Sequence, residues 1–453
     1  MSDGIILIVL DTLRLDFARR YFSPWLKKLG FIEHIALTTS PWTVPAHVSI
    51  FSGLYPSFHG VYPKNDSLAD FVIPRRLTKF MLHDYLVKKG YRTIFLSSNP
   101  YISPSFGYRS IDAFYDTTNI NRPIIELSEN EKYIISHLRG LSRMKRMANL
   151  IKRHKLGLLS KIIINYIYRK TINLPIIKDI DMKRRKWPLD KGASKINDLL
   201  KRINFGKKFF LFINYMEAHE PYTKDNSFTK QVLENVVLGR KHDDYYRFWK
   251  KKYEDEVRYL LTKVNESLDI LKDLEVFNNS LIIITSDHGQ LLGEHDRLGH
   301  GMFLYDELIK VPLYIKPPNN AKIREPYNHE ALLSLAKIKR FIKNYVENKI
   351  VDITLLKDDL PMAEVFGMNY VTQEIKNILK NVNEDKLKKA YMSMKKHRIA
   401  VCFNNCKIVY NVNNGSIEML FPYCNEATVR KALKRIRKRI GLSQQLIFRN
   451  RYK

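Results

Sequence analysis

The sequence has few cysteines and no long apolar segment. Its 453 residues include only Cys402, Cys406 and Cys424, an odd, sparse set that favours neither a disulfide framework nor a four-ligand zinc site. We therefore expect a reducing compartment, with Cys402 and Cys406 as packing residues on the same side of one predicted strand. No run approaches the ~18 apolar residues that span a bilayer. No basic segment precedes the apolar residues 5–10, so we expect a cytoplasmic protein without a signal peptide or transmembrane helix.

Acidic residues are also scarce relative to basic ones. The chain carries 77 Lys and Arg against 46 Asp and Glu, a formal net charge of +31. This excess favours an anionic substrate or an anionic membrane surface as a partner, and we consider nucleic acid the less favoured partner. Hydrophobic residues make up 45% and aromatic residues 12% of the chain, which excludes a disordered protein. The length predicts one large domain and a smaller one, and it leaves the oligomeric state open.

Apolar runs alternate with helical patterns along most of the chain. Continuous runs typical of strands buried on both faces occur at residues 5–10, 93–96, 209–213, 281–285 and 311–315. Residues 77–89, 191–203 and 253–274 between them have helical periodicity. This alternation predicts an α/β fold with a mostly parallel sheet flanked by helices.

The rest of the chain suggests three further parts beside a catalytic domain over residues 1–345. Residues 138–186 carry 15 Lys or Arg against 2 acids and predict a basic helical insertion, for which we prefer a cap on the sheet over a membrane-surface segment. Residues 346–425 predict a small antiparallel α+β subdomain, with strands at 397–403, 406–411 and 416–420 and a tight turn at Asn414-Gly415. Residues 426–453 predict a basic terminal helix or tail with one apolar face.

Residues that bind cations follow two of the predicted strands directly. Asp11 follows the first strand, and Asp287 and His288 follow the fourth. Because ligands gather beyond the carboxyl ends of parallel strands, we expect these side chains to share one divalent ion, with Mn²⁺, Zn²⁺, Ca²⁺ and Mg²⁺ all open. Thr43 stands just before Pro45, which opens a helical stretch. A cation would lower the pKa of the Thr43 hydroxyl and make it a nucleophile toward phosphorus or sulfur.

These pieces together resemble the sulfatase branch of the alkaline phosphatase superfamily, in the order that the family uses. The resemblance covers roughly residues 4–125 and 190–315, and it does not include the basic stretch 138–186. The segments that carry it are Val9-Leu10-Asp11-Thr12-Leu13-Arg14, Ser40-Pro41-Trp42-Thr43-Val44-Pro45-Ala46-His47, Ser52-Gly53-Leu54-Tyr55-Pro56, His219-Glu220-Pro221-Tyr222, Thr285-Ser286-Asp287-His288-Gly289 and Gly299-His300-Gly301. It implies an alkaline-phosphatase-like sheet with a small C-terminal antiparallel subdomain.

The resemblance also implies a role for each position. Its metal ligands would be Asp11, Thr43, Asp287 and His288, with Thr43 also the nucleophile. His47 replaces the arginine of the family's Cys-x-Pro-x-Arg motif and would support the transferring group. His219 would contact the ester oxygens, and His300 takes a place often held by lysine beside the leaving group, where an imidazolium could act as general acid. Lys64 and Asn65 would contact the anionic substrate.

One departure from the family bears on the reaction. Sulfatases convert a Cys or Ser at the nucleophile position to formylglycine, and Thr43 cannot undergo that conversion. We therefore expect a metal-dependent hydrolase or transferase with a covalent Thr43 intermediate, acting on phosphate esters in preference to sulfate esters. The alternative is a catalytically degenerate protein of the same fold that binds an anionic membrane or nucleic acid.

Overall fold

The fold is described from a computed structural model of the whole chain. It describes residues 3–64, 67–119, 143–171, 185–225, 227–319, 321–326, 332–370, 372–379, 382–403, 406–420 and 424–451, with isolated residues at 125, 131, 134–135 and 182–183. Two compact units emerge, one formed by residues 1–117 and 192–453 and the other by residues 118–191. The predicted insertion at 138–186 falls within the second unit; the domain boundaries stay predictions.

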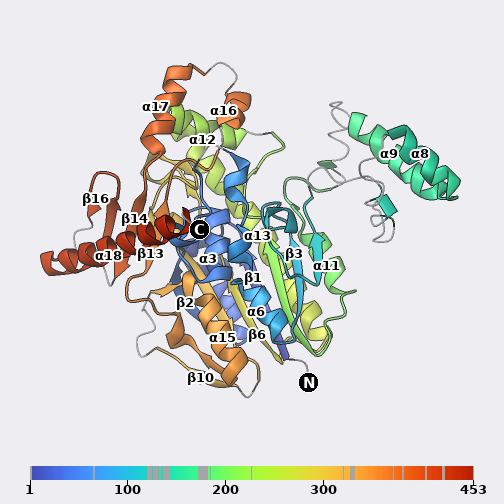
Figure 1. Cartoon of the computed structure of the whole chain (residues 1–453), viewed down its shortest axis with the longest axis horizontal. Coiled ribbons are helices and arrows are strands. Elements are labelled where there is room, and N and C mark those ends of the chain that lie inside the picture. The colour runs from blue at the N-terminus through green and yellow to red at the C-terminus, as the bar shows by residue number, and fades with distance from the viewer. Residues whose placement is uncertain are drawn as a thin grey trace. The chain divides into compact units, whose positions relative to one another are not determined.

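An eight-stranded, mostly parallel sheet forms the centre of the larger unit (Figure 1). Its strand order is β11-β2-β9-β6-β1-β5-β3-β4, and only β9 runs antiparallel to its neighbours. The strands are β1 (Asp3–Leu10), β2 (Ile32–Leu37), β3 (Arg92–Ser97), β4 (Ala113–Asp116), β5 (Lys208–Tyr215), β6 (Ser280–Thr285), β9 (Lys310–Lys316) and β11 (Leu333–Ser334). All five predicted strands are present, and the mixed, mostly parallel α/β sheet is confirmed.

Helices cover both faces of this sheet, because the central strands are apolar on both sides. In β1, the side chains of Ile6 and Ile8 pack in one core with α11, α12 and α13, whereas Leu7 and Val9 pack in the other with α3, α6 and α15. This two-sided burial explains the continuous apolar runs of the sequence. The bounds are α3 (Thr43–Ser52), α6 (Leu82–Lys88), α11 (Ala193–Leu200), α12 (Ser227–Leu238), α13 (Asp243–Asp273) and α15 (Ile338–Asn348).

The two units contain further helices and strands. They are α1 (Leu15–Tyr21), α2 (Ser23–Lys28), α4 (Pro56–His59), α5 (Arg75–Thr78), α8 (Arg143–Lys152), α9 (Leu156–Thr171), α14 (Asp306–Ile309), α16 (Thr372–Ile378), α17 (Glu384–Met394), β7 (Leu291–Leu292), β8 (Leu298–Gly299), β10 (Lys322–Arg324) and β12 (Ile350–Asp352). The helix predicted over 77–89 is wrong in detail, since a turn separates α5 from α6. Within the described part of the chain, no helix has both the length and the apolar character needed to cross a membrane.

A four-stranded antiparallel sheet follows near the C-terminus, in the order β13-β14-β15-β16. Its strands are β13 (Met362–Val365), β14 (Arg398–Phe403), β15 (Cys406–Asn411) and β16 (Ser416–Leu420), and α18 (Glu426–Arg451) follows them. The three predicted strands and the terminal helix are confirmed, and Ile436 of α18 packs on one face of the sheet. The sequence did not predict strand β13, because four residues are too few to show the apolar periodicity of a strand.

The expectation for the cysteines is wrong in two respects. Cys406 forms a disulfide with Cys424, so it is not simply a packing residue, while Cys402 is a buried free thiol. The two also belong to opposite faces of the small sheet. The reason is that a hairpin separates them, with Phe403 opposite Cys406, so the two-residue alternation of a single strand does not extend across both.

Glu364 of β13 links the small sheet to α4. Its buried carboxylate accepts hydrogen bonds from the Ser57 backbone N–H (2.7 Å) and hydroxyl (2.9 Å) at the start of α4. The Arg439 guanidinium acts on it electrostatically, and His397 Nε2 lies 4.0 Å away. Burial outweighs these partners and raises the pKa of Glu364 to about 7.

We expect Glu364→Gln to remove a component of the pH dependence of stability. Between pH 4.5 and about 7 the folded protein keeps a proton on Glu364 that the unfolded chain has lost. The free energy of unfolding should therefore fall as pH rises through this range, by at most about 1.4 kcal/mol per pH unit. Urea unfolding of both proteins across the range measures the slope, with Glu347→Gln as the control. An unchanged slope in Glu364→Gln would contradict this assignment.

Candidate metal and ester-binding site

The polar cluster forms where four neighbouring parallel strands end. Strands β6, β1, β5 and β3 are adjacent, and Val9 is level with Thr285 and Leu10 with Tyr215. Asp11 directly follows β1 and Asp287 lies two residues beyond β6. The aligned strand ends therefore bring two carboxylates from residues 276 positions apart into one place, as the sequence predicted.

The N-terminus of α3 completes this cluster. Thr43 is the first residue of the helix, after Trp42 at the N-cap position. Its hydroxyl Oγ1 lies 3.2 Å from Nε2 of His288 and 3.5 Å from Oδ2 of Asp11. The structure thus brings together all four residues predicted as metal ligands, and the positive end of α3 faces them.

Both carboxylates are buried and each has an oxygen without a hydrogen-bond partner. These atoms are Oδ1 of Asp11 and Oδ2 of Asp287. Burial raises the pKa of Asp11 to about 7, helped by repulsion from Asp287, and burial likewise raises the pKa of Asp287 to about 7. Two unpaired, buried carboxylate oxygens beside an imidazole and a hydroxyl fit a divalent cation, because an ion would compensate the charge that burial disfavours.

The main chain orients the histidines of the site. Nδ1 of His47, His219 and His288 lies 2.7–3.0 Å from the carbonyl oxygens of Thr43, Glu220 and Gly289 respectively. Since a carbonyl only accepts, each Nδ1 carries the proton and each Nε2 is left with a lone pair in the neutral ring. This is the arrangement that metal-binding histidines require. It makes Nε2 of His288 the ligand atom.

Gly289 lets the chain hold His288 in this position. A Cβ built on Gly289 would come within 1.9 Å of the Glu307 carbonyl oxygen, so any side chain there would collide with backbone. The Gly289 N–H also donates to the Leu308 carbonyl oxygen (2.9 Å). The loop after β6 is therefore packed against α14, which leaves His288 little room to move.

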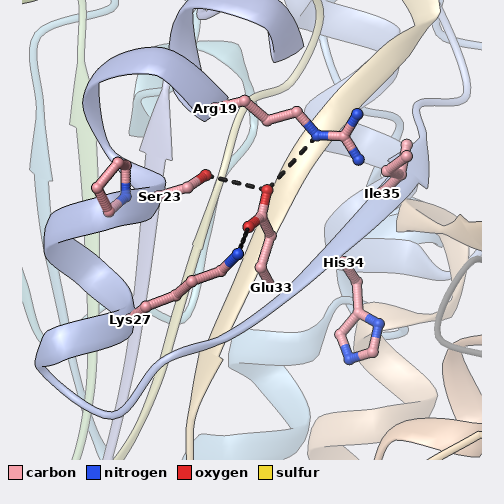
Figure 2. Close-up of a pocket in the computed structure, with 7 residues that line it drawn as sticks. Arg19, Ser23, Lys27, Glu33, His34 and Ile35 are labelled. Carbon is pink, nitrogen blue, oxygen red and sulfur yellow. Dashed lines mark hydrogen bonds and ion pairs between the residues drawn. The ribbon is translucent and has the colours of Figure 1, made fainter.

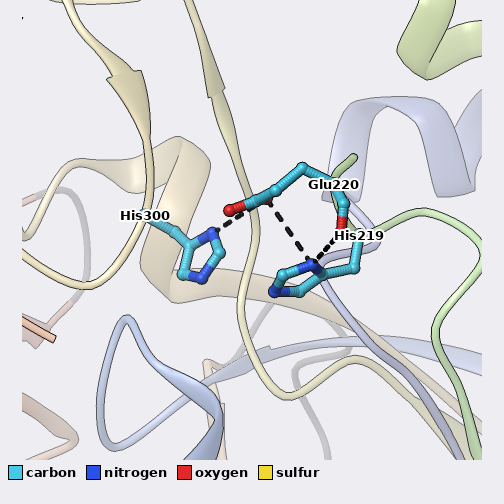
Figure 3. A group of neighbouring side chains, drawn as sticks. All are labelled: His219, Glu220 and His300. Atoms are coloured by element: carbon cyan, nitrogen blue, oxygen red, sulfur yellow. Dashed lines mark hydrogen bonds and ion pairs between the residues drawn. The ribbon is translucent and has the colours of Figure 1, made fainter. Parts of the chain in front are cut away.

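A second group of polar side chains lies beside the first (Figure 3). Nδ1 of both His219 and His300 lies 3.6 Å from Oε2 of Glu220, and the ring centroids of His288 and His300 are 4.6 Å apart. The three residues His219, Glu220 and His300 have donor atoms close enough for a second ion. The Glu220 carbonyl holds Nδ1 of His219, and Gln290 Oε1 lies 2.7 Å from Nδ1 of His300, so each ring presents its Nε2 atom. We interpret these histidines as substrate-facing groups, which are the roles that the family resemblance implies for them.

Burial affects the charge of these imidazoles unequally. It lowers the pKa of His47 to about 3, and burial together with His288 and His219 lowers the pKa of His300 well below its usual value. Burial also opposes protonation of His219, but the Glu220 and Asp11 carboxylates raise its pKa above the usual value. The imidazolium expected at His300 is thus disfavoured in this environment, and His219 is the more readily protonated ring.

The predicted substrate contact Lys64 is not brought to the cluster. Lys64 makes local contacts, with Nζ bonded to the Gly60 carbonyl oxygen and lying 4.7 Å from the centroid of the Tyr62 ring. Asn65 lies outside the described residues. Their roles stay predictions.

Several site residues were not predicted. Asn99 follows the end of β3, and its Nδ2 donates to Oδ2 of Asp11 (3.1 Å). Asn214, near the end of β5, places Nδ2 3.4 Å from Nε2 of His47. Gln290 Nε2 donates to Glu220 (2.9 Å). The position of Asn99 after a predicted strand is the signal by which the sequence could have identified it as a site residue. Nothing in the sequence indicates that Gln290 contacts Glu220.

A separate pocket beside β2 has a different character. It has a volume of about 610 Å³ and is lined by residues including Arg19, Lys27 and Glu33. Figure 2 shows that the cations are directed at Glu33, which lies 2.7 Å from Lys27 and 3.6 Å from Arg19. The residues line the amino-terminal half of β2, whereas the cluster lies beyond the carboxyl ends of the central strands. Its charges compensate one another, so we assign it no catalytic role.

Comparison with known proteins gives consistent results. A family model described as "Sulfatase" matches residues 5–334. An uncharacterized sulfatase, YidJ, of Escherichia coli is 26% identical over 149 residues, 28% of this chain and 30% of that protein. The low-salt glycan biosynthesis sulfotransferase Agl7 of Haloferax volcanii is 38% identical over 109 residues, 23% of this chain and 26% of that protein. The matches therefore span less than a third of these relatives' lengths.

Solved structures share the fold over almost the whole chain. A putative sulfatase from Bacteroides thetaiotaomicron superposes with a TM-score of 0.59 at 12% identity, covering 100% of this chain and 93% of the other. A phosphonate monoester hydrolase of Agrobacterium radiobacter superposes with a TM-score of 0.56 at 14% identity, covering 98% and 96%. At these identities the likeness establishes the fold alone.

The carboxylate oxygens of Asp11 and Asp287 that lack a hydrogen-bond partner lead to a prediction about metal binding. We expect Asp287→Asn to abolish the stabilisation of the protein by divalent cations, because it removes one of the carboxylate ligands. The same change should stabilise the metal-free protein, because it removes one of two buried like charges. The side-chain Oδ1 can still accept hydrogen bonds from the Thr12 and His288 N–H groups. For the wild type, a cation at 100 times its Kd should add about 2.7 kcal/mol. Thermal unfolding after chelator treatment, with each of the four cations added back, measures both effects.

Asp255→Asn, at a partly exposed position of α13, serves as the matched control and should respond to cations like the wild type. If Asp287→Asn kept the full stabilisation by every cation, the carboxylate pair would not be the metal site.

Proposed function

The chain belongs to the sulfatase family, and from this premise we propose that it is a metal-dependent ester hydrolase or transferase with Thr43 as its nucleophile. The observation that carries the proposal is the Thr43 hydroxyl at the N-terminus of α3, in contact with Asp11 and His288. The substrate we propose is an anionic ester, in keeping with the excess of positive charge. Residues 1–345 would form the catalytic domain.

Asp11, Thr43, Asp287 and His288 would hold one divalent cation. When bound, such an ion supplies Lewis-acid stabilisation of negative charge on the transferring group. The donor set of carboxylates, a hydroxyl and one imidazole suits Mn²⁺, Zn²⁺, Ca²⁺ or Mg²⁺. Asn99 keeps Asp11 in place through its hydrogen bond to Oδ2.

The first chemical step is attack by Oγ1 of Thr43 on the phosphorus or sulfur atom. The Thr43 proton passes to Oδ2 of Asp11, 3.5 Å from Oγ1, because Nε2 of His288 is the atom that would bind the cation. A bond forms between Oγ1 and the central atom, while the bond to the leaving-group oxygen breaks and that oxygen takes up a proton from water. Water, or an acceptor hydroxyl in a transferase, then displaces Thr43 and regenerates its hydroxyl.

The neighbouring histidines are placed to contact the transferring group and the leaving group. The Thr43 carbonyl orients His47, and Asn214 lies against its Nε2, so the ring is fixed beside the nucleophile. His219 and His300 have ring centroids 4.9 Å apart and are held by Glu220 and Gln290. We assign His219 to the ester oxygens and His300 to the leaving group. Such preorganised groups are needed because proton transfer alone contributes only about 10²–10⁴-fold.

Thr43 itself favours phosphate esters over sulfate esters. A threonine cannot give the formylglycine of typical sulfatases, whereas an unmodified hydroxyl can form a phosphate ester directly. Transfer of a sulfo group is the second candidate, and the 109-residue match to a protein named as a sulfotransferase supports it. Both candidates use the same nucleophile, so substrate choice distinguishes them.

We expect Thr43→Ala to lose turnover by about 10³-fold or more, because it removes the atom that forms the covalent ester. The measurement uses p-nitrophenyl phosphate, bis-p-nitrophenyl phosphate and p-nitrophenyl sulfate with each divalent cation. Acid quenching followed by peptide mass spectrometry should find the modified Thr43 in the wild type. Thr43→Ser keeps a hydroxyl and should retain measurable turnover.

Thr78→Ala, which removes an exposed hydroxyl remote from the site, is the control and should leave turnover unchanged. Absence of wild-type turnover on all three esters, with intact metal binding, would instead support the degenerate binding protein. Faster turnover of the sulfate ester than of both phosphate esters would overturn the proposed preference.

A further inference from the structure

The smaller unit contains a helical hairpin that the proposed function does not use. Helices α8 and α9 lie side by side in Figure 1 and are joined by residues 153–155. Their shared core is small and consists of Leu150, Leu158 and Leu159, with Ile162 against it. Most of the apolar side chains of the hairpin are therefore left outside its core.

In α8 these outward side chains form one stripe. Met144, Met147 and Ile151 are spaced by three and four residues, which places them on one side of the helix. Met144 is 78% exposed and Ile151 is 52% exposed. An apolar stripe of this kind is typical of a helix face that contacts something apolar.

A second stripe runs along α9. Leu156, Ile163 and Ile167 share one side of this helix by their spacing of seven and four residues, and Ile164 borders it. Leu156 is 60% exposed and Ile167 is 54% exposed. No charged residue interrupts this stripe, since Ser160 is the only polar residue on it.

Cations flank the α8 stripe and the connection to α9, whereas Lys161 of α9 is paired with Glu131. Lys145 and Lys152 lie along one flank of the α8 stripe by helical spacing, and Arg153 and Lys155 are exposed at the connection to α9. No Asp or Glu occurs between Glu131 and Asp179. Long basic side chains can extend to an anionic layer while the apolar stripe enters the region beneath it.

We propose that the α8–α9 hairpin docks on an anionic lipid surface, with the two apolar stripes in the interfacial layer and the flanking cations at the headgroups. A second copy of this chain suits the hairpin poorly, because self-association would bring like charges together. Nucleic acid would engage the cations and leave the apolar stripes exposed to water. The proposal does not depend on the catalytic mechanism.

Flotation of the full-length protein with lipid vesicles tests this docking. The wild type should float with vesicles that contain phosphatidylglycerol and much less with pure phosphatidylcholine, since the surface charge contributes to binding. The triple variant Ile163→Ser, Ile164→Ser, Ile167→Ser should bind at least about tenfold more weakly, because it removes the apolar contacts. Lys152→Glu with Arg153→Glu should weaken binding similarly and reduce its salt dependence.

Matched controls separate the hairpin from the net charge of the whole chain. Arg247→Glu with Lys250→Glu on α13 changes the charge by the same amount, and Met392→Ser removes an exposed apolar side chain of α17. Both should float like the wild type. All variants should keep wild-type turnover and thermal stability, because none belongs to the proposed catalytic site.

An environment-sensitive label gives an independent readout. Cys402 is buried and the other two cysteines are paired, so Ile163→Cys provides a thiol that can be labelled selectively in the folded protein. A fluorophore there should shift to the blue on anionic vesicles, and one at Gln373→Cys should not.

Three results would overturn the proposal. One is no flotation with anionic vesicles, and another is an equal loss of binding in the α13 control. The third is a wild-type dimer that becomes a monomer in the triple variant, which would identify a second copy as the occupant of the stripes.

Discussion

The structure of the site depends on two carboxylates that are buried close together. Asp11 and Asp287 are each fully buried and each keeps one oxygen without a partner. Such an arrangement is unfavourable unless a positive charge compensates it, since burial and mutual repulsion both oppose ionisation. The surrounding groups compensate the two carboxylates only in part. Asn99 donates a hydrogen bond to one oxygen of Asp11, and the Thr12 and His288 N–H groups donate to one oxygen of Asp287. The remaining two oxygens define where a cation belongs.

The parallel sheet makes this arrangement possible. Adjacent strands β6, β1, β5 and β3 end at one edge, where the main chain stops pairing and its side chains turn toward a common space. Main-chain carbonyls then hold Nδ1 of three histidines, so their Nε2 atoms carry the available lone pairs. The fold thus determines the tautomers of the site as well as its distances. The small antiparallel sheet supports it from outside, through Glu364 and the start of α4.

The basic insertion and the site are distinct features of the chain. The insertion lies in a compact unit of its own, its helices expose apolar stripes, and its sequence lacks acids over a long stretch. The site, in contrast, is buried, and hydrogen bonds compensate its two carboxylates only in part. A net charge of +31 therefore has at least one local basis outside the proposed metal site, and the excess of lysine and arginine alone does not describe the substrate.

The sequence was sufficient for the α/β class and the central strands, because continuous apolar runs mark buried parallel strands. It also predicted that Asp11, Asp287 and His288 lie together, because polar residues after such strands meet at one edge. Thr43 joined this set through its place before a helix and through the family resemblance. The sequence was insufficient for the break between α5 and α6, for the short strand β13 and for the pairing of Cys406 with Cys424. It also did not reveal Asn214 beside His47, or Gln290 between Glu220 and His300. The pattern of apolar and polar residues along a segment indicates which side of its own helix or strand each residue lies on. Contacts between elements depend on how hairpins, loops and helices pack, and only the tertiary structure specifies those distances.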